Sequence, residues 1–179
     1  MINYGAKELA AAARVVRKNT IQVAEEIPED KYDFVAAPGC RSVRALLAHI
    51  VKAPALQYDV HRDRRATTLQ GFDWTAFMGK LAAFEAAPHT KAELIALLRD
   101  EGEKFAAWVE TLTPEFLNET FTDPMGQNPK TRFENLLAVK EHEMHHRAQL
   151  MLMLRMVGGV PHLTRERQAR AAARAAATK

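Results

Sequence analysis

The sequence contains a single cysteine and no long apolar run. Because Cys40 is alone among 179 residues, no disulfide can form within the chain, and we expect a reducing, cytoplasmic setting. The most apolar stretch, residues 150–157, is interrupted by Arg155 and is far too short to cross a bilayer. The N-terminal segment carries Lys7 and Glu8 without a sustained apolar run, which is not the pattern of a secretory signal. We therefore expect no association with a membrane.

Patterns typical of β-strands are also lacking. We find no run of alternating β-branched residues bounded by turn residues, whereas apolar residues recur at steps of three and four. With 47% hydrophobic and 26% charged residues, the chain has the composition of a globular protein and the length of one domain with a sizeable core. An all-α fold is the expectation that follows.

Positive charge is concentrated at one end of the chain. The formal net charge is +3, and a sequence pI of about 9.1 would suit nucleic acid as a partner. Residues 164–179, however, are rich in Ala and Arg and carry a net charge of +4, so that residues 1–163 carry −1. We predict one domain over residues 1–163 and a basic Ala/Arg-rich tail over residues 164–179. Nucleic acid is not the partner we expect, and binding through the tail stays an alternative.

Helical periodicity predicts a four-helix bundle with short extra helices. The long helices are predicted over residues 5–26, 42–53, 90–112 and 131–157. Capping motifs mark three of their starts, namely the N-cap Ser42 and the capping boxes Thr90–Glu93 and Thr131–Glu134. Shorter helices are predicted over residues 55–66 and 74–86.

Two histidines in the last long helix have the spacing of metal ligands. His142 and His146 are four residues apart, so they project from one helix face, in line with the apolar Val139 and Leu150. Two imidazoles can converge on one ion at this spacing. His49 is the best third ligand, because it lies on the apolar side of the helix over residues 42–53. Three protein ligands would leave a coordination position open, as in catalytic sites. The alternative is that His49 is a hydrogen-bonded core histidine and that His142 and His146 are structural or solvated.

The remaining histidines are weaker candidates. His145 points around the helix from the pair, and His61 lies among charged residues in a stretch we expect to be solvated. His89 begins a helix, and His162 follows the last long helix.

The string from His142 to His146 also matches the H-E-x-x-H pattern of zinc proteases, in which the glutamate is the general base. The extended protease pattern requires Gly and His at positions held here by Gln149 and Leu152, so we discount a protease. We expect Glu143 and Glu141 to be solvated or to orient an imidazole, Glu143 being the better candidate. For Arg147 we expect an interhelical salt bridge, with binding of a substrate carboxylate as the alternative.

Two segments, S-V-R-A-L-L-A-H-I over residues 42–50 and H-E-M-H-H-R-A-Q-L over residues 142–150, resemble the DinB/YfiT-like superfamily. The resemblance implies a four-helix bundle with up-down-down-up topology that usually forms homodimers. It also implies that three histidines, here His49, His142 and His146, bind a divalent metal such as nickel or zinc. The family usually has glycine where this chain has Ala148.

Characterised relatives of this family use a low-molecular-weight thiol, as in mycothiol-dependent maleylpyruvate isomerase and bacillithiol S-transferases. The resemblance therefore implies a thiol S-transferase acting on small electrophiles, with a bound metal lowering the pKa of the thiol. A metal-dependent hydrolase, in which the metal activates water, is one alternative. A metal-binding or stress-associated bundle without catalytic turnover is the other. The residues do not identify the metal, because three imidazoles accept zinc, nickel, copper or iron.

Overall fold

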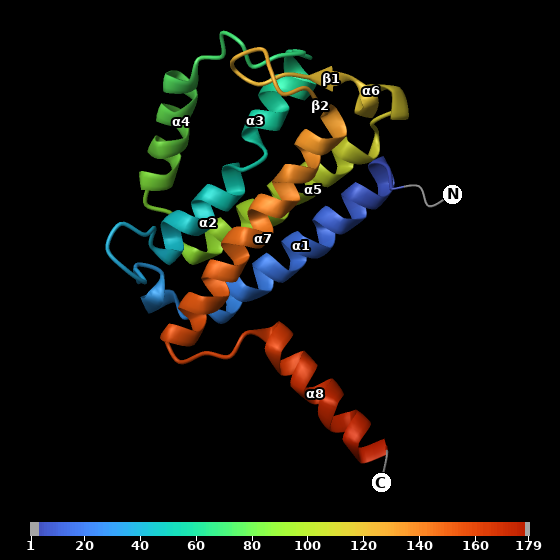
Figure 1. Cartoon of the computed structure of the whole chain (residues 1–179). Helices are drawn as coiled ribbons and strands as arrows, with labels where there is room; N and C mark the ends of the chain where they lie inside the picture. The colour runs from blue at the N-terminus through green and yellow to red at the C-terminus, as the bar shows by residue number, and fades with distance from the viewer. Residues whose placement is uncertain (1–3, 178–179) are drawn as a thin grey trace.

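The computed structural model describes residues 4–177 and confirms the predicted all-α bundle. Its four long helices are α1 (Ala6–Glu26), α2 (Val43–Lys52), α5 (Lys91–Glu110) and α7 (Arg132–Met156). α1 packs on α5 and α7, and α2 packs on the same two helices from the other side. Figure 1 shows α1 and α7 running in one direction and α2 and α5 in the other, which is the expected up-down-down-up topology.

Local sequence signals determine where the long helices begin. The Ser42 hydroxyl accepts a hydrogen bond from the Ala45 amide at 3.2 Å, as expected of an N-cap. Both predicted capping boxes form, at the start of α5 and at the start of α7. These caps fix the register of α2 and α7, the helices that carry the candidate ligands.

Several shorter elements connect the long helices. They are η1 (Glu29–Lys31), α3 (Ala55–Gln57), the π-helical segment η2 (Tyr58–Asp63), α4 (Trp74–Ala86), α6 (Pro114–Asn118), β1 (Thr120–Phe121), β2 (Lys130–Thr131) and α8 (His162–Ala177). β1 and β2 form an antiparallel pair of two residues each, which the sequence did not predict. The region predicted as one helix over residues 55–66 is instead α3 followed by η2.

The basic tail is largely helical. α8 begins at His162 and projects away from the bundle (Figure 1). It therefore starts two residues before the predicted start of the tail at residue 164. His162 is buried, and Arg165 pairs with Glu26 at the end of α1, so the base of α8 is attached to the bundle. That the tail is a separate unit stays a prediction. None of the helices that the structure describes is long and apolar enough to cross a membrane.

Two apolar clusters fill the bundle, with a polar layer between them. One contains Leu94 and Leu98 of α5 with Leu150 and Leu154 of α7, and the other contains residues nearer the opposite ends of the same helices. Between them lie Arg17, Glu143 and His146, all buried. The candidate site is therefore part of a layer where polar groups must find partners inside the protein.

Glycine is required at one position of this layer. A Cβ on Gly102 of α5 would lie 2.5 Å from the Arg17 Cγ, closer than atoms can approach. Its absence lets the Arg17 side chain cross α5 and donate to the Leu98 carbonyl at 2.8 Å. The same guanidinium forms a two-pronged ion pair with Glu143, with distances of 2.8 Å from Nε to Oε1 and 2.9 Å from Nη2 to Oε2.

Candidate metal centre

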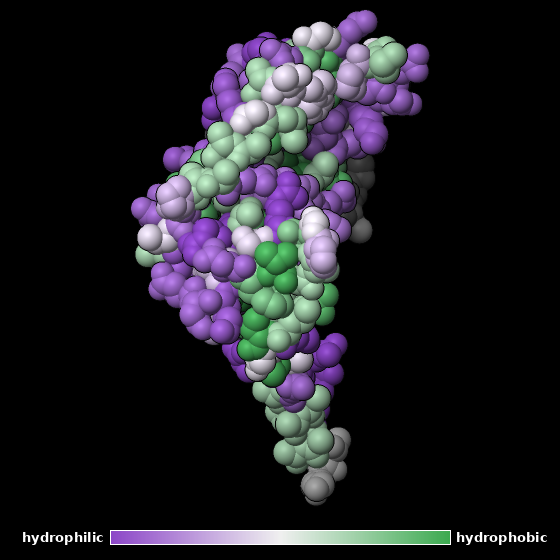
Figure 2. Space-filling view, turned by 90° about the vertical axis from the view of Figure 1, so that its left-hand side faces the viewer, coloured by the Kyte–Doolittle hydropathy of each residue, from purple (hydrophilic) through white to green (hydrophobic). Residues whose placement is uncertain are grey.

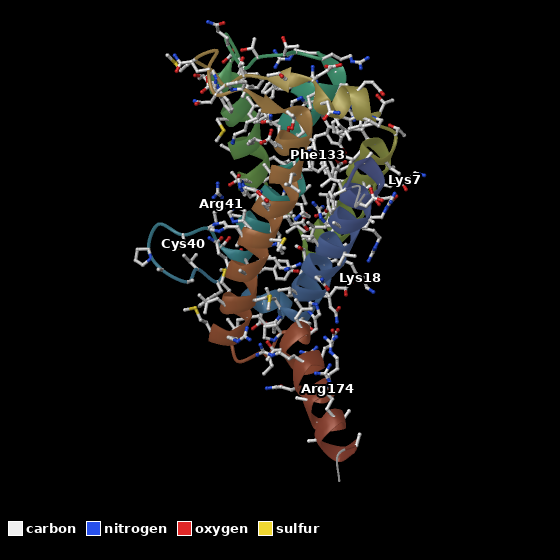
Figure 3. The ribbon with its side chains drawn as sticks, turned by 45° about the vertical axis from the view of Figure 1, so that its right-hand side comes forward. Lys7, Lys18, Cys40, Arg41, Phe133 and Arg174 are labelled. Atoms are coloured by element: carbon white, nitrogen blue, oxygen red, sulfur yellow. The ribbon has the colours of Figure 1, made fainter. Side chains whose placement is uncertain are left out.

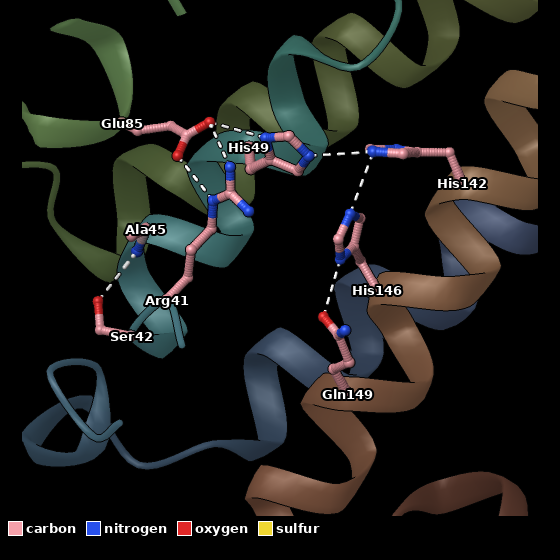
Figure 4. Close-up of polar contacts among 8 residues, drawn as sticks. All are labelled: Arg41, Ser42, Ala45, His49, Glu85, His142, His146 and Gln149. Carbon is pink, nitrogen blue, oxygen red and sulfur yellow. Dashed lines mark hydrogen bonds and ion pairs between the residues drawn. The ribbon is translucent and has the colours of Figure 1, made fainter. Parts of the chain in front are cut away.

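Three histidines from two helices meet at the edge of the polar layer. The His142 Nε2 lies 3.0 Å from the His49 Nε2 and 3.1 Å from the His146 Nε2, and one ring nitrogen of each lies within 4.8 Å of the others (Figure 4). α7 supplies two of them one turn apart, and α2 supplies the third across the helix interface. The structure thus brings together the three residues singled out in the sequence.

Neighbouring side chains orient two of the imidazoles. The His49 Nδ1–H donates to the Glu85 carboxylate at 2.7 Å, and the His146 Nδ1–H donates to the Gln149 amide oxygen at 2.8 Å. Each ring then carries its proton on Nδ1 and presents the lone pair of Nε2 to the centre. Metal-binding histidines in proteins are commonly oriented in this way.

His142 lacks such a partner. Its buried Nδ1 makes no hydrogen bond to any described residue, and its Nε2 faces two lone pairs of which it can satisfy at most one. A cation between the three Nε2 atoms would satisfy all of them. Three nitrogens bound tetrahedrally at roughly 2.0–2.1 Å from zinc lie about 3.3 Å apart, close to the two separations that His142 makes with His49 and His146. The residues present therefore fit a divalent metal ion.

Burial keeps His142 and His146 neutral. Burial, reinforced by the neighbouring histidines, lowers the pKa of His142 to about 4. Burial also lowers the pKa of His146, although the hydrogen bond with Gln149 opposes the shift. A metal needs the neutral form, so both side chains are ready to bind one at neutral pH.

Glu85 and Arg41 extend the site on the side of α2. Glu85 lies on α4, and its second oxygen accepts from the Arg41 Nε at 2.7 Å (Figure 4). Burial opposes ionisation of Glu85, but the hydrogen bonds from Arg41 and His49 outweigh it and lower the pKa of the carboxyl group. Glu85 is therefore an anion whose position is fixed from two sides.

The other four histidines do not converge on the centre. His145 is exposed and contacts the Gln149 amide, and the His89 ring bonds the Phe84 carbonyl. His162 is buried beside Asn19 at the base of α8. His61 corrects an expectation, because it is 2% exposed rather than solvated, and its Nδ1 accepts from Arg132 at 2.8 Å. The cause is η2, whose wider turn rotates His61 toward the protein interior.

Glu143 and Arg147 also differ from expectation. Glu143 faces α1, where it pairs with Arg17, so it neither orients an imidazole nor points into the centre as a protease base would. Glu141 is exposed, as expected of a solvated residue. Arg147 donates to the Val16 carbonyl at 3.4 Å rather than to a carboxylate.

Three residues of the site were missed in the sequence. Gln149 follows His146 by three residues, a spacing that places both on one helix face and could have identified it. Glu85 and Arg41 reach the site only through the packing of α4 and the loop before α2, and no local pattern marks them. Cys40, next to Arg41, lies exposed on that loop (Figure 3).

Residues 12–150 match the DinB superfamily, which is most of the chain. The chain belongs to this superfamily. It is 28% identical over 144 residues to the uncharacterized protein YjoA of Bacillus subtilis, covering 79% of this chain and 84% of that protein.

Solved structures share the fold. A crystal structure of YjoA, a DinB-like protein, superposes with a TM-score of 0.63 at 24% identity, covering 86% of this chain and 94% of YjoA. B. subtilis YfiT, described as a probable metal-dependent hydrolase with an unusual four-helix bundle topology, has a TM-score of 0.63 at 19% identity, covering 86% and 88%. The sibling lethal factor precursor DfsB has a TM-score of 0.68 at 19% identity, covering 89% and 100%. The family and the bundle are thereby confirmed.

Proposed function

We propose that this DinB protein is a metal-dependent thiol S-transferase acting on small electrophiles, with His49, His142 and His146 holding nickel or zinc. The observation that carries the proposal is the convergence of three imidazole Nε2 atoms, two of them oriented by Glu85 and Gln149. Three neutral ligands leave the charge of a divalent ion undiminished, and an ion bound there would lower the pKa of a thiol beside it.

The protein's own residues would then position the reactants. His49, His142 and His146 fix where the thiol sulfur sits, and Glu85 holds His49 in place through its carboxylate. In the transfer, the thiol loses its proton to solvent and the sulfur forms a bond to an electrophilic carbon. The leaving group departs with the electrons of the broken bond.

Side chains around the triad favour thiol transfer over hydrolysis. Among the described residues, Glu85 is the carboxylate that contacts the triad, and it is already engaged by Arg41 and His49. Glu143 is engaged by Arg17. A carboxylate free to accept a proton from water is therefore lacking around the triad in the described residues. A hydrolase remains the second candidate, because YfiT is described as a probable metal-dependent hydrolase.

Metal binding is the first test. Elemental analysis and titration with nickel and zinc should give one ion per chain, with affinity more than 100-fold weaker for His49→Ala and His146→Ala. The matched control is Glu141→Gln, one residue from a ligand but exposed, and its affinity should change by less than threefold. No binding of either ion, or equal losses in all three variants, would contradict the centre.

Turnover is the second test. The metal-loaded protein is incubated with 1-chloro-2,4-dinitrobenzene and glutathione, cysteine, mycothiol or bacillithiol, and with p-nitrophenyl acetate in the absence of thiol. Thiol conjugation lost in His146→Ala supports the proposal. Thiol-independent ester cleavage alone would favour the hydrolase, and inactivity in both assays would favour a non-enzymatic metal-binding bundle. A cytoplasmic location and a homodimer also stay predictions.

A further inference from the structure

α4 is an apolar helix that the protein does not bury. Its sequence, WTAFMGKLAAFEA, has one acidic and one basic residue, yet none of its side chains is fully buried. Trp74 is 37% exposed and Met78 is 51% exposed. Figure 2, in which α4 faces the viewer, shows apolar residues along this helix. Leaving apolar surface in water costs about 25 cal/mol per Å², so the exposed surface is available to stabilise a bound apolar group.

One face of α4 lines a cavity. Trp74, Phe77, Met78 and Leu81 recur at steps of three and four, which places them on one side of the helix. Opposite them lie Ala138 and Val139 of α7, with Ala53 and Leu56 at the end of α2 and in α3 completing the walls. The cavity has a volume of about 290 Å³, at the lower end of the ~300–1,000 Å³ typical of ligand pockets. That volume suits one or two rings rather than an extended chain.

The cavity ends at the histidines. His49 and His142 belong to its lining, so a molecule within it lies directly beside two of the three converging imidazoles. Of the charged side chains only Lys52 contributes to the lining, and its ammonium lies 4.4 Å from the centre of the Phe84 ring. Because the rest of the lining is mostly apolar and the Lys52 ammonium is directed to the Phe84 ring, an uncharged ligand fits the cavity. A larger cavity of about 580 Å³ shares Lys52, Phe77 and Leu81 with this one but contains none of the three histidines.

We propose that the cavity between α4, α2 and α7, which we call the α4 seat, binds the ring of an uncharged aromatic electrophile. The reacting carbon is then directed toward His49 and His142. Aromatic walls supplied by Trp74 and Phe77 suit an aromatic ring, which stacks on them edge to face or offset. This inference names the substrate class of the function proposed above and rests on it.

The test uses a probe that cannot react. Trifluoromethylbenzene carries no leaving group open to thiol attack, and its ¹⁹F signal is followed by NMR as metal-free, full-length protein is added. We expect saturable binding by the wild type. We expect none of 2,2,2-trifluoroacetamide, a polar compound with the same fluorinated group. No saturation with trifluoromethylbenzene up to its solubility limit overturns the proposal.

Two variants locate the probe. Ala138→Phe places a ring in the seat and should weaken binding at least tenfold, whereas Ala83→Phe, on the exposed side of α4, should leave binding within twofold. If Ala138→Phe does not fold, Leu81→Asn tests the same wall with a side chain of similar size, and at least a fivefold loss is expected. Unchanged binding in the seat variants, or an equal loss in Ala83→Phe, overturns the proposal.

These results are separable from the proposed function. Saturable binding that Ala138→Phe abolishes supports the α4 seat even where no thiol conjugation is detected, in which case thiol transfer is the part that fails. Thiol conjugation without saturable probe binding gives the reverse result and overturns the seat alone.

Discussion

Glu143 and His142 are neighbours in sequence but lie on two different faces of α7. They differ in whether the protein satisfies their hydrogen bonds. Glu143 faces α1, where the Arg17 guanidinium satisfies both of its oxygens. His142 faces α2, where its Nδ1 has no partner among the described residues and its Nε2 meets two further imidazole nitrogens. The two residues are adjacent on the same helix, so each side chain meets a different neighbouring helix.

The comparison teaches how to tell a structural polar group from a functional one. A group that the protein satisfies completely is part of the folded structure, and its loss should be seen in stability. A group left with converging, unsatisfied nitrogens contributes little to stability and implies a ligand supplied from outside. The predictions below test whether the two faces separate in this way.

The largest effect is expected at the satisfied face. Glu143→Leu leaves the Arg17 charge buried at 5% exposure without a partner, which should lower the free energy of unfolding by about 3–5 kcal/mol. Urea unfolding of metal-free protein measures it. The double variant Arg17→Met/Glu143→Leu should recover most of the loss, because no charge is then buried alone.

His142→Leu provides the contrast in the same urea experiment. It should cost less than about 1 kcal/mol, since at most one hydrogen bond between imidazoles is lost on this face. Equal losses in the free energy of unfolding for Glu143→Leu and His142→Leu would show that both residues contribute to stability in the same way.

The next largest effect on stability is expected at His61. This buried histidine, unlike His142, has a hydrogen-bond partner for its Nδ1. Burial, and secondly the Arg132 charge, lower the pKa of His61 to about 4. Below pH ~6.5 the unfolded chain binds a proton that the folded protein does not, so stability falls as pH drops from about 6.5 to about 4. The contribution of this residue is at most roughly 3 kcal/mol.

The measurement is urea unfolding between pH 4 and pH 7. His61→Gln keeps an oxygen that can accept from Arg132 but cannot titrate, so the pH dependence should become shallower. His142, whose pKa is likewise lowered to about 4, adds to the same acid-sensitive range, and some dependence should therefore persist. An unchanged slope in His61→Gln would mean that the folded protein admits a proton at His61.

Much of the fold could be predicted because its signals are local. The capping boxes at Thr90 and Thr131 and the N-cap Ser42 each involve residues three apart, and the structure has all three. The spacing of His142 and His146 likewise determines that both project from one face of α7. Predicting His49 required one further inference. His49 lies on the apolar side of its own helix, and in a bundle that side faces the other helices.

The rest depends on which residue of another helix lies opposite. Periodicity shows that Glu143 faces away from His142. It does not show that the partner of Glu143 is Arg17, which is 126 residues earlier in the chain. Glu85 reaches His49 through the packing of α4 on α2. His61 was predicted to be solvated because the residues around it are charged. That sequence gives no sign of the π-helical turn that directs His61 into the protein.

The residues that orient the imidazoles should affect metal affinity and leave stability nearly unchanged. Gln149→Leu removes the acceptor for the His146 Nδ1–H, and Glu85→Leu removes the acceptor for the His49 Nδ1–H. Each should weaken zinc or nickel binding by about 10–100-fold, measured by competition with a chelator. Glu85→Gln keeps an acceptor oxygen and should lose less.

Glu141→Gln is the matched control for these variants, since Glu141 is exposed on α7. Its affinity should stay within threefold of the wild type. If Gln149→Leu and Glu85→Leu bound metal as tightly as Glu141→Gln, the hydrogen bonds to Nδ1 would be without consequence for the centre.

Ala148 lies on a third, exposed side of α7, and its replacement should give the smallest effect. Gly in the interior of a helix costs about 0.5–1 kcal/mol relative to Ala, because the unfolded chain gains freedom. Ala148→Gly should therefore lower stability by about that amount in urea unfolding while leaving metal affinity within twofold, although it lies two residues from His146. Ligands on a rigid helix keep their relative positions when its outer surface changes. A loss of metal affinity beyond tenfold would show that a change on the outer side of α7 reaches the histidines. The Glu143 face and the His142 face would then not be independent of each other.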